Sequence, residues 1–113
     1  MPKATLKFKV WYDIEAHFDY AYVEASSNGG QTWELLRGLH TTNENRLDLS
    51  FGHAYTGTSG GMEKPQWLQE SIDLTSFVGG EVLIRLEYVT DGAVHNHGLA
   101  IDDISIPEIG FFD

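Results

Sequence analysis

The sequence predicts an all-β domain, an antiparallel, jelly-roll-like β-sandwich formed by one unit of 113 residues. Three observations predict it. Apolar and polar residues alternate in several segments, which is typical of strands with one buried face. Twelve glycines mark the expected corners, and no segment carries the apolar stripe of an amphipathic helix. Short strands at regular spacing with turn residues between them are typical of a sandwich.

Two strands are expected near the start of the chain, at residues 6–13 and 20–26. Every second residue is apolar in both, namely Leu6, Phe8, Val10, Tyr12 and then Ala21, Val23, Ala25. Asn28-Gly29 follows and predicts a tight turn, because both residues tolerate a positive φ. The wider pattern Ser26-x-Asn28-x-Gly30-x-Thr32-Trp33 is similar to the Asp-box of sialidase-type propellers. One copy in 113 residues excludes a propeller, so we interpret it as a structural turn.

The second half of the chain begins with a long expected connection at residues 38–61, with one short strand near 46–51. Residues 63–71 contain Pro65 and show no apolar stripe, so no helix is expected there. One helical turn is expected at residues 73–77, before Gly79-Gly80. The last two strands are expected at residues 82–90 and 98–106, where apolar residues again alternate with polar ones.

The charge balance excludes several classes of function. Seven basic and seventeen acidic residues give a net charge of −10, which disfavours nucleic acid and anionic membrane surfaces as partners. No run of 18 apolar residues occurs, so membrane insertion is not expected. The absence of cysteine excludes a disulfide scaffold, a thiolate zinc site and a cysteine nucleophile. No catalytic motif such as His-Glu-x-x-His or a nucleophile elbow is present, so the chain is not expected to be an enzyme by itself.

Excess carboxylates are compatible with calcium, which takes six to eight oxygen ligands. Acidic residues occur in three places: at the turn after the first expected strand, at the end of the strand expected at residues 82–90, and inside the last strand. They are Asp13, Glu15, Asp19, Asp91, Asp102 and Asp103. A carboxylate inside an apolar strand is costly unless it is paired or ligated, which makes Asp102 the most informative residue. Its alternatives to metal binding are an ion pair with Arg85 or hydrogen bonds from loop amides, and the acidic residues as a whole could serve solubility alone.

Two further groups of residues suggest binding chemistry. His95-x-His97 could hold zinc if it lay on a strand, but residues 91–98 indicate a loop. Trp11, Tyr20 and Tyr22 could form an exposed aromatic platform on which sugar rings stack. The competing interpretation is that these aromatic residues belong to the core of a small sandwich.

The ordered segments 6–15, 18–24, 26–33, 71–80, 82–91 and 98–104, the last containing Ile101-Asp102-Asp103-Ile104, resemble one family along nearly the whole chain. The chain resembles the MAM-like accessory β-sandwich of immune inhibitor A-type (M6 family) secreted metallopeptidases. Asn28 departs from the pattern, because an Asp is usual at that turn.

This resemblance implies a non-catalytic, calcium-stabilised accessory or interaction module, secreted or at the cell surface. Residues 1–113 would be a single module excised from a larger multidomain protein. Its partners would be neighbouring domains of the parent protein or a protein substrate. By position, the calcium ligands carried over are Glu15, Asp19, Asp91, Asp102 and Asp103. The alternative is a carbohydrate-binding module on the same fold, with a glycan as ligand. A third interpretation, an enzyme in its own right, would require a pocket of converging polar groups.

Overall fold

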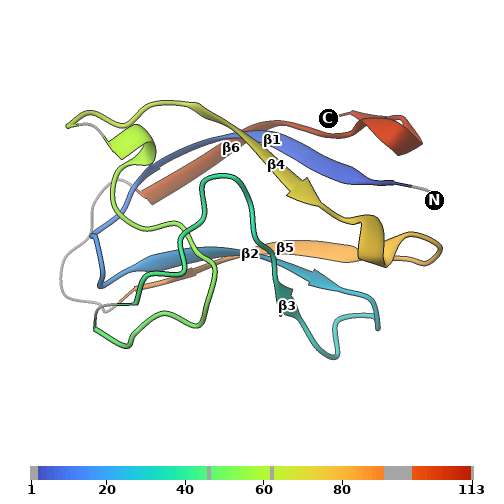
Figure 1. The fold of residues 1–113 in the computed structure, drawn as a ribbon, viewed down its shortest axis with the longest axis horizontal. Coiled ribbons are helices and arrows are strands. Elements are labelled where there is room, and N and C mark those ends of the chain that lie inside the picture. The colour runs from blue at the N-terminus through green and yellow to red at the C-terminus, as the bar shows by residue number, and fades with distance from the viewer. Residues whose placement is uncertain (1–2, 46, 62, 91–97, 113) are drawn as a thin grey trace.

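The structure is a computed structural model that describes residues 3–45, 47–61, 63–90 and 98–112. Two antiparallel sheets face each other as a sandwich, with strand orders β4-β1-β6-β7 and β3-β2-β5 (Figure 1). The all-β prediction is confirmed. The strands are β1 Thr5–Asp13, β2 Tyr20–Ser26, β3 Glu34–Leu35, β4 Leu68–Asp73, β5 Leu83–Val89, β6 Gly98–Ile106 and β7 Phe111–Phe112.

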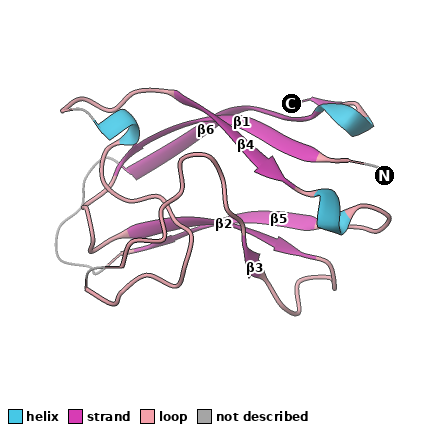
Figure 2. Cartoon of the chain, in the orientation of Figure 1, coloured by secondary structure: helices cyan, strands magenta, loops and turns pink. Residues whose placement is uncertain are grey.

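In the part of the chain that the structure describes, helical structure is limited to three single turns, η1 Ser59–Gly61, η2 Thr75–Phe77 and η3 Pro107–Ile109 (Figure 2). The predicted helical turn at 73–77 is confirmed by η2. There the Asp73 carboxylate accepts the Thr75 backbone N–H at 2.9 Å and so satisfies a donor at the start of the turn. No helix among the described residues is long and apolar enough to cross a membrane.

The strands with clear alternation were predicted within one or two residues, but β4 was not predicted. The register explains why: Leu6, Phe8 and Val10 of β1 lie opposite Ile72, Glu70 and Leu68 of β4. The inward face of β4 therefore carries a carboxylate between two apolar residues. An acidic residue at the central inward position hides the period of two on which strand prediction depends.

The main core lies between the sheets and is formed by the inward residues of β1, of β2 and of the β4–η2 corner. The buried members are Ala4, Leu6, Phe8, Val10, Tyr12, Ile14, Ala21, Val23, Ala25, Leu36, Tyr55, Ile72 and Leu74. At about 1.5–3 kcal/mol for each large apolar side chain, this burial is the main favourable contribution to folding.

The long connection after β3, which we call the covering segment (residues 36–45 and 47–58), lies over the outer face of β2. It buries Tyr20 and Tyr22 in a second, smaller core with Ala54. Backbone bonds of 3.0 and 2.8 Å join Ala21 to Tyr55, and a bridge pairs Thr42 with Ala54. β2 is consequently buried on both faces.

The short strand predicted near residues 46–51 is wrong for the described part, residues 47–51, which form a turn and loop. The Asn45 side chain closes this turn. Its oxygen accepts the Ser50 N–H at 2.9 Å and its amide donates to the Ser50 carbonyl at 3.2 Å. Asn side chains that bond nearby backbone compete with strand pairing in this way.

Candidate functional site

The predicted calcium ligands fall into two separate places. Asp102 lies opposite Lys9 on β1, whereas Gly98 lies opposite Asp13, at the end of the strand that leads to Glu15. Four residues of strand, about 13 Å, separate the two positions. Asp91 lies outside the described residues. The structure therefore does not bring Asp102 and Asp103 to Glu15 and Asp19.

Asp102 and Asp103 sit at a β-bulge on the outer face of the four-stranded sheet. The register between β1 and β6 shifts here, and Asp103 has a φ of 54°. Both residues are exposed. The Asp103 carboxylate pairs with Lys9 at 3.1 Å, and the Asp102 carboxylate accepts the Asp103 N–H at 2.8 Å. The expectation of a costly carboxylate inside the apolar strand is wrong, because the bulge turns both groups to solvent.

Of the two alternatives for Asp102, a backbone amide does bond its carboxylate, that of Asp103, whereas the pairing with Arg85 is wrong. Arg85 pairs instead with the Glu24 carboxylate on the outer face of the other sheet, and its guanidinium lies 4.0 Å from the Trp33 ring. The hydrogen bond that a protonated Glu87 carboxyl donates to Glu24 raises the pKa of Glu87, which lies beside Arg85 on β5. This network fixes the 27–33 hairpin against the sheet.

Glu15 and Asp19 form the other place, in the turn between β1 and β2. Asp19 is fully buried, and its backbone N–H bonds the Glu15 carbonyl at 3.0 Å. Burial raises the pKa of the nearby Tyr88, and the charges of Asp19, Asp13 and Glu15 raise it further. All three carboxylates therefore lie close enough to Tyr88 to act on its hydroxyl. Among the described residues, however, no three acidic or histidine side chains are arranged to hold a metal ion.

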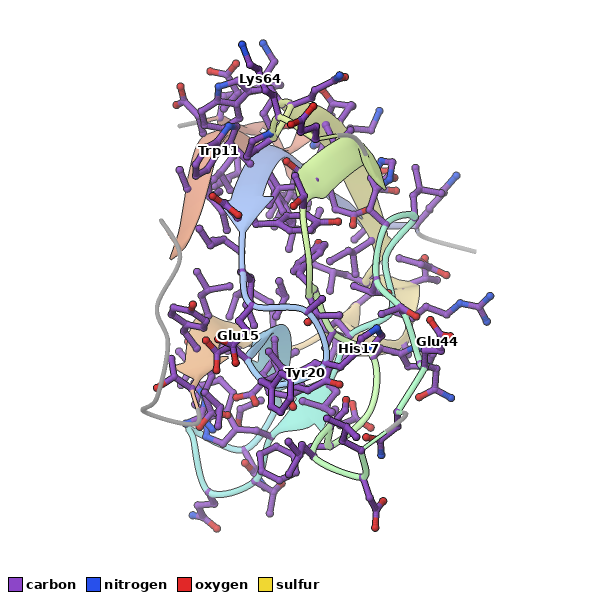
Figure 3. The ribbon with its side chains drawn as sticks, turned by 90° about the vertical axis from the view of Figure 1, so that its left-hand side faces the viewer. Trp11, Glu15, His17, Tyr20, Glu44 and Lys64 are labelled. Atoms are coloured by element: carbon purple, nitrogen blue, oxygen red, sulfur yellow. The ribbon has the colours of Figure 1, made fainter. Side chains whose placement is uncertain are left out.

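The aromatic platform predicted from Trp11, Tyr20 and Tyr22 does not form. Tyr20 and Tyr22 are buried under the covering segment, and Tyr22 stacks on Phe51 with ring centroids 5.6 Å apart. Trp11 lies on the opposite sheet, as Figure 3 shows for Trp11 and Tyr20. These two tyrosines therefore belong to the core, which was the competing interpretation.

The predicted turn at Asn28 is confirmed. Its side-chain oxygen accepts the N–H groups of Gln31 and Thr32 at 3.1 and 3.0 Å. The Ser26 hydroxyl donates to the same oxygen at 2.8 Å and accepts the Gly30 N–H at 2.9 Å. The Asn28 amide also donates to the Thr32 hydroxyl. The polar side chains of this pattern therefore bond within the turn itself, which agrees with the interpretation of the pattern as a structural turn.

Sequence reasoning missed Glu70, whose carboxylate is fully buried between β4 and the covering segment. One oxygen accepts the N–H groups of Leu39 and Ser71 at 2.6 and 2.8 Å. The other accepts the His40 N–H at 3.2 Å and the Tyr55 hydroxyl at 2.7 Å. Four donors fill the acceptor sites of a carboxylate. Glu70 therefore ties the covering segment to the sandwich and keeps no capacity for a metal or substrate.

The largest unexplained feature is an open apolar edge between β5 and β6. Ile84, Leu86 and Tyr88 lie on the inner face of β5, opposite Ala25, Val23 and Ala21 of β2. Although they face the interior, they are 38%, 44% and 39% exposed. None of the described strands pairs with the other edge of β5. In Figure 3 the covering segment runs down the right-hand side, whereas β5 and β6 lie towards the left.

This edge is hollowed. One hollow of about 180 Å³ lies between the sheets, lined by apolar residues that include Phe8, Ile84 and Ile104. A second of about 620 Å³ shares Ile84 and Ile104 and reaches Phe111. We call the two together the open groove. Contiguous exposed apolar surface of this kind is typical of interaction sites, and no catalytic site is evident among the described residues.

The sequence matches known proteins along almost its whole length. The family model described as "Immune inhibitor A-like, MAM domain" matches residues 1–110. The chain is 33% identical over 104 residues to the pre-pro-metalloprotease PrtV of Vibrio cholerae. It is 29% identical over 103 residues to immune inhibitor A of Bacillus thuringiensis subsp. alesti, and 25% identical over 103 residues to bacillopeptidase F of Bacillus subtilis.

These alignments cover 92%, 91% and 91% of this chain but 10%, 13% and 6% of the relatives. The chain therefore spans about a tenth of the length of the curated relatives it matches. No solved structure gives a significant match.

Proposed function

Because the chain belongs to the immune inhibitor A-like MAM domain family, we propose that it is a non-catalytic accessory module of a secreted metallopeptidase. The match over residues 1–110 carries this proposal, since two of the relatives are named as a metalloprotease and as immune inhibitor A. The open groove supports it, because a module that packs against the rest of a larger protein needs an apolar contact surface. Its place of action would be extracellular.

The division of labour between module and parent protein tests this proposal. The purified chain, supplied with zinc, is expected to leave both casein and a short peptide uncleaved, while the parent protein hydrolyses them. Peptidase activity in the isolated chain would contradict the non-catalytic role. If the parent protein has no peptidase activity with any added divalent metal ion, the proposal that it is a metallopeptidase is contradicted.

Calcium stabilisation is a second part of the proposal, and the turn between β1 and β2 is the better of the two acidic places. At the bulge, Lys9 already supplies a cation to Asp103. At the turn, by contrast, the charges of three carboxylates add to burial in raising the pKa of Tyr88. A divalent cation would offset this local negative charge. The described ligands do not complete a site, and one of the five predicted ligands, Asp91, lies outside the described residues.

A thermal-shift titration separates the two places. Binding to the folded state alone adds about 2.7 kcal/mol when calcium is at one hundred times its Kd. We expect calcium to raise the Tm of the chelator-treated chain, and Asp19→Asn to abolish that increment. The matched variant Asp103→Asn should keep it. A wild-type Tm that does not respond to calcium would remove the ion from the proposal.

A carbohydrate-binding role is a second candidate, favoured by one observation. Trp67 is 53% exposed and lines a shallow hollow of about 530 Å³ with Lys9, Gln69 and Asp103. An exposed indole beside hydrogen-bonding groups is suited to a sugar ring. Affinity electrophoresis with soluble polysaccharides tests it: retardation that Trp67→Ala abolishes supports this role, and unretarded wild-type protein on every polysaccharide rejects it.

A further inference from the structure

The open groove runs along the edge of β5 with which none of the described strands pairs. A strand at the edge of a sheet presents unpaired backbone N–H and C=O groups, and natural proteins cover or disrupt long apolar edges. The edge of β5 runs for seven residues with three large apolar side chains on its inner face, Ile84, Leu86 and Tyr88. On the opposite layer, β6 of the four-stranded sheet carries Ile101, Ile104 and Ile106, which are also only partly buried.

The shape and chemistry of the groove define its occupant. It follows β5 and is lined on both layers mainly by apolar side chains, with Arg85 and Glu81 as its charged residues. An extended segment about seven residues long could bond the free edge of β5 and place alternate side chains in the hollows. The side chains on its other face would lie beside Arg85 and Glu87 on the outer surface of the sheet. The occupant is thus a β-strand with alternating apolar and polar residues.

The source of this strand is indicated by where the chain ends lie. The N and C labels fall at the same end of the molecule (Figure 1). A hollow there is lined by Lys3, Ala4 and Ile109 together with Val82, just before β5, and it shares Val82 and Ile109 with the open groove. Polypeptide connected to either end would start at the mouth of the groove. The relatives supply such polypeptide, because about nine-tenths of their length lies outside the matched region.

We propose that a β-strand from the polypeptide flanking this domain in its parent protein adds to the edge of β5 and fills the open groove. This rests on the proposed function, in which the chain is a module of a longer protein. The contact is covalently tethered, so its effective concentration is high and a single strand suffices to hold the module in place. The accessory domain is then completed by, and fastened to, the protein that carries it.

Photo-cross-linking in the full-length parent protein tests the proposal. p-Benzoylphenylalanine replaces Leu86 in the groove, and in a control protein it replaces Leu39, which is 71% exposed on the covering segment. We expect position 86, and not position 39, to cross-link within the same polypeptide to a segment outside residues 1–113. Hydrogen exchange provides the second readout. Alternate β5 amides should exchange at least about tenfold more slowly in the parent protein than in the isolated chain.

Three results would overturn the proposal. Cross-links between two molecules would assign the edge to a second copy, and cross-links confined to residues 1–113, residues 91–97 included, would assign it to the domain itself. Equal exchange of the β5 amides in parent and isolated chain would leave the edge open. None of these readouts depends on peptidase activity. A parent protein that shows the cross-link but hydrolyses nothing would contradict the proposed function alone.

Discussion

Replacing Glu70 by Gln tests whether one buried carboxylate holds the covering segment in place. The substitution keeps the size and shape of the side chain but exchanges one acceptor oxygen for an NH₂ group. All four partners of Glu70 are donors, two on each oxygen. If the NH₂ group faces the Leu39 and Ser71 N–H groups, two hydrogen bonds are lost. If it faces the other side, the bond from His40 N–H is lost, whereas the Tyr55 hydroxyl can accept from the NH₂ group instead.

The size of the effect follows from these lost bonds. A hydrogen bond to a charged group contributes about 1.5–3 kcal/mol, and each donor left unsatisfied in a buried place costs about 1–3 kcal/mol. Allowing for local relaxation, we expect Glu70→Gln to lower the free energy of unfolding by about 3 kcal/mol. For a domain of this length that corresponds to a Tm lower by about 12 °C, out of a total stability of about 5–15 kcal/mol.

Urea denaturation and differential scanning calorimetry at pH 7 measure this loss. The matched control is Glu34→Gln, an exposed carboxylate on β3, which should change Tm by less than about 2 °C. Native-state hydrogen exchange should also show faster exchange at Leu39 and His40, the covering-segment amides released from the carboxylate. If Glu70→Gln behaves as Glu34→Gln does, the carboxylate does not hold the segment and the reasoning is refuted.

Three other predictions concern particular positions. Gly38→Ala places a Cβ about 2.5 Å from the Glu70 carboxylate and should lower Tm by several degrees in calorimetry. In the control Gly80→Ala, the added Cβ has no atom within 4 Å, and Tm should stay unchanged or rise slightly. Equal changes of Tm in the two variants would contradict a clash with Glu70. Asn28→Ala should cost about 1 kcal/mol in urea unfolding, whereas Asn28→Asp keeps the acceptor oxygen and should cost less; equal losses would show that the acceptor is unimportant. Burial and the bond to Glu70 raise the pKa of Tyr55 above its usual value of 10, so the unfolded state loses this proton first. Stability should fall as the pH rises past about 10, and an unfolding midpoint independent of pH there would refute it.

Several features of the fold could be predicted because they are recorded in short stretches of sequence. β1, β5 and β6 carry a period of two, since one face of each strand points into the sandwich. β2 carries the same period, although the covering segment buries its second face as well. The Asn28 turn was predictable for a similar reason, because its bonds are made within residues 26–33.

The candidate site was harder to predict because it depends on which strands lie side by side. The separation of Asp102 and Asp103 from Glu15 and Asp19 follows from the register of β6 on β1, and the bulge at Asp103 turns both groups to solvent. Nothing local distinguishes Glu70 from an exposed glutamate. Its four donors come from its neighbour and from residues up to 31 positions away.

By itself, then, the sequence determined the all-β class, the strands that alternate and the hairpin turn, because backbone geometry and one-sided burial act between near neighbours. Only the tertiary structure decided the rest: the burial of Glu70, the second core under the covering segment and the exposed inner face of β5. Each of these depends on the free energy of contacts between distant segments, and the alternating pattern of a strand is the same whether its inner face is covered or open.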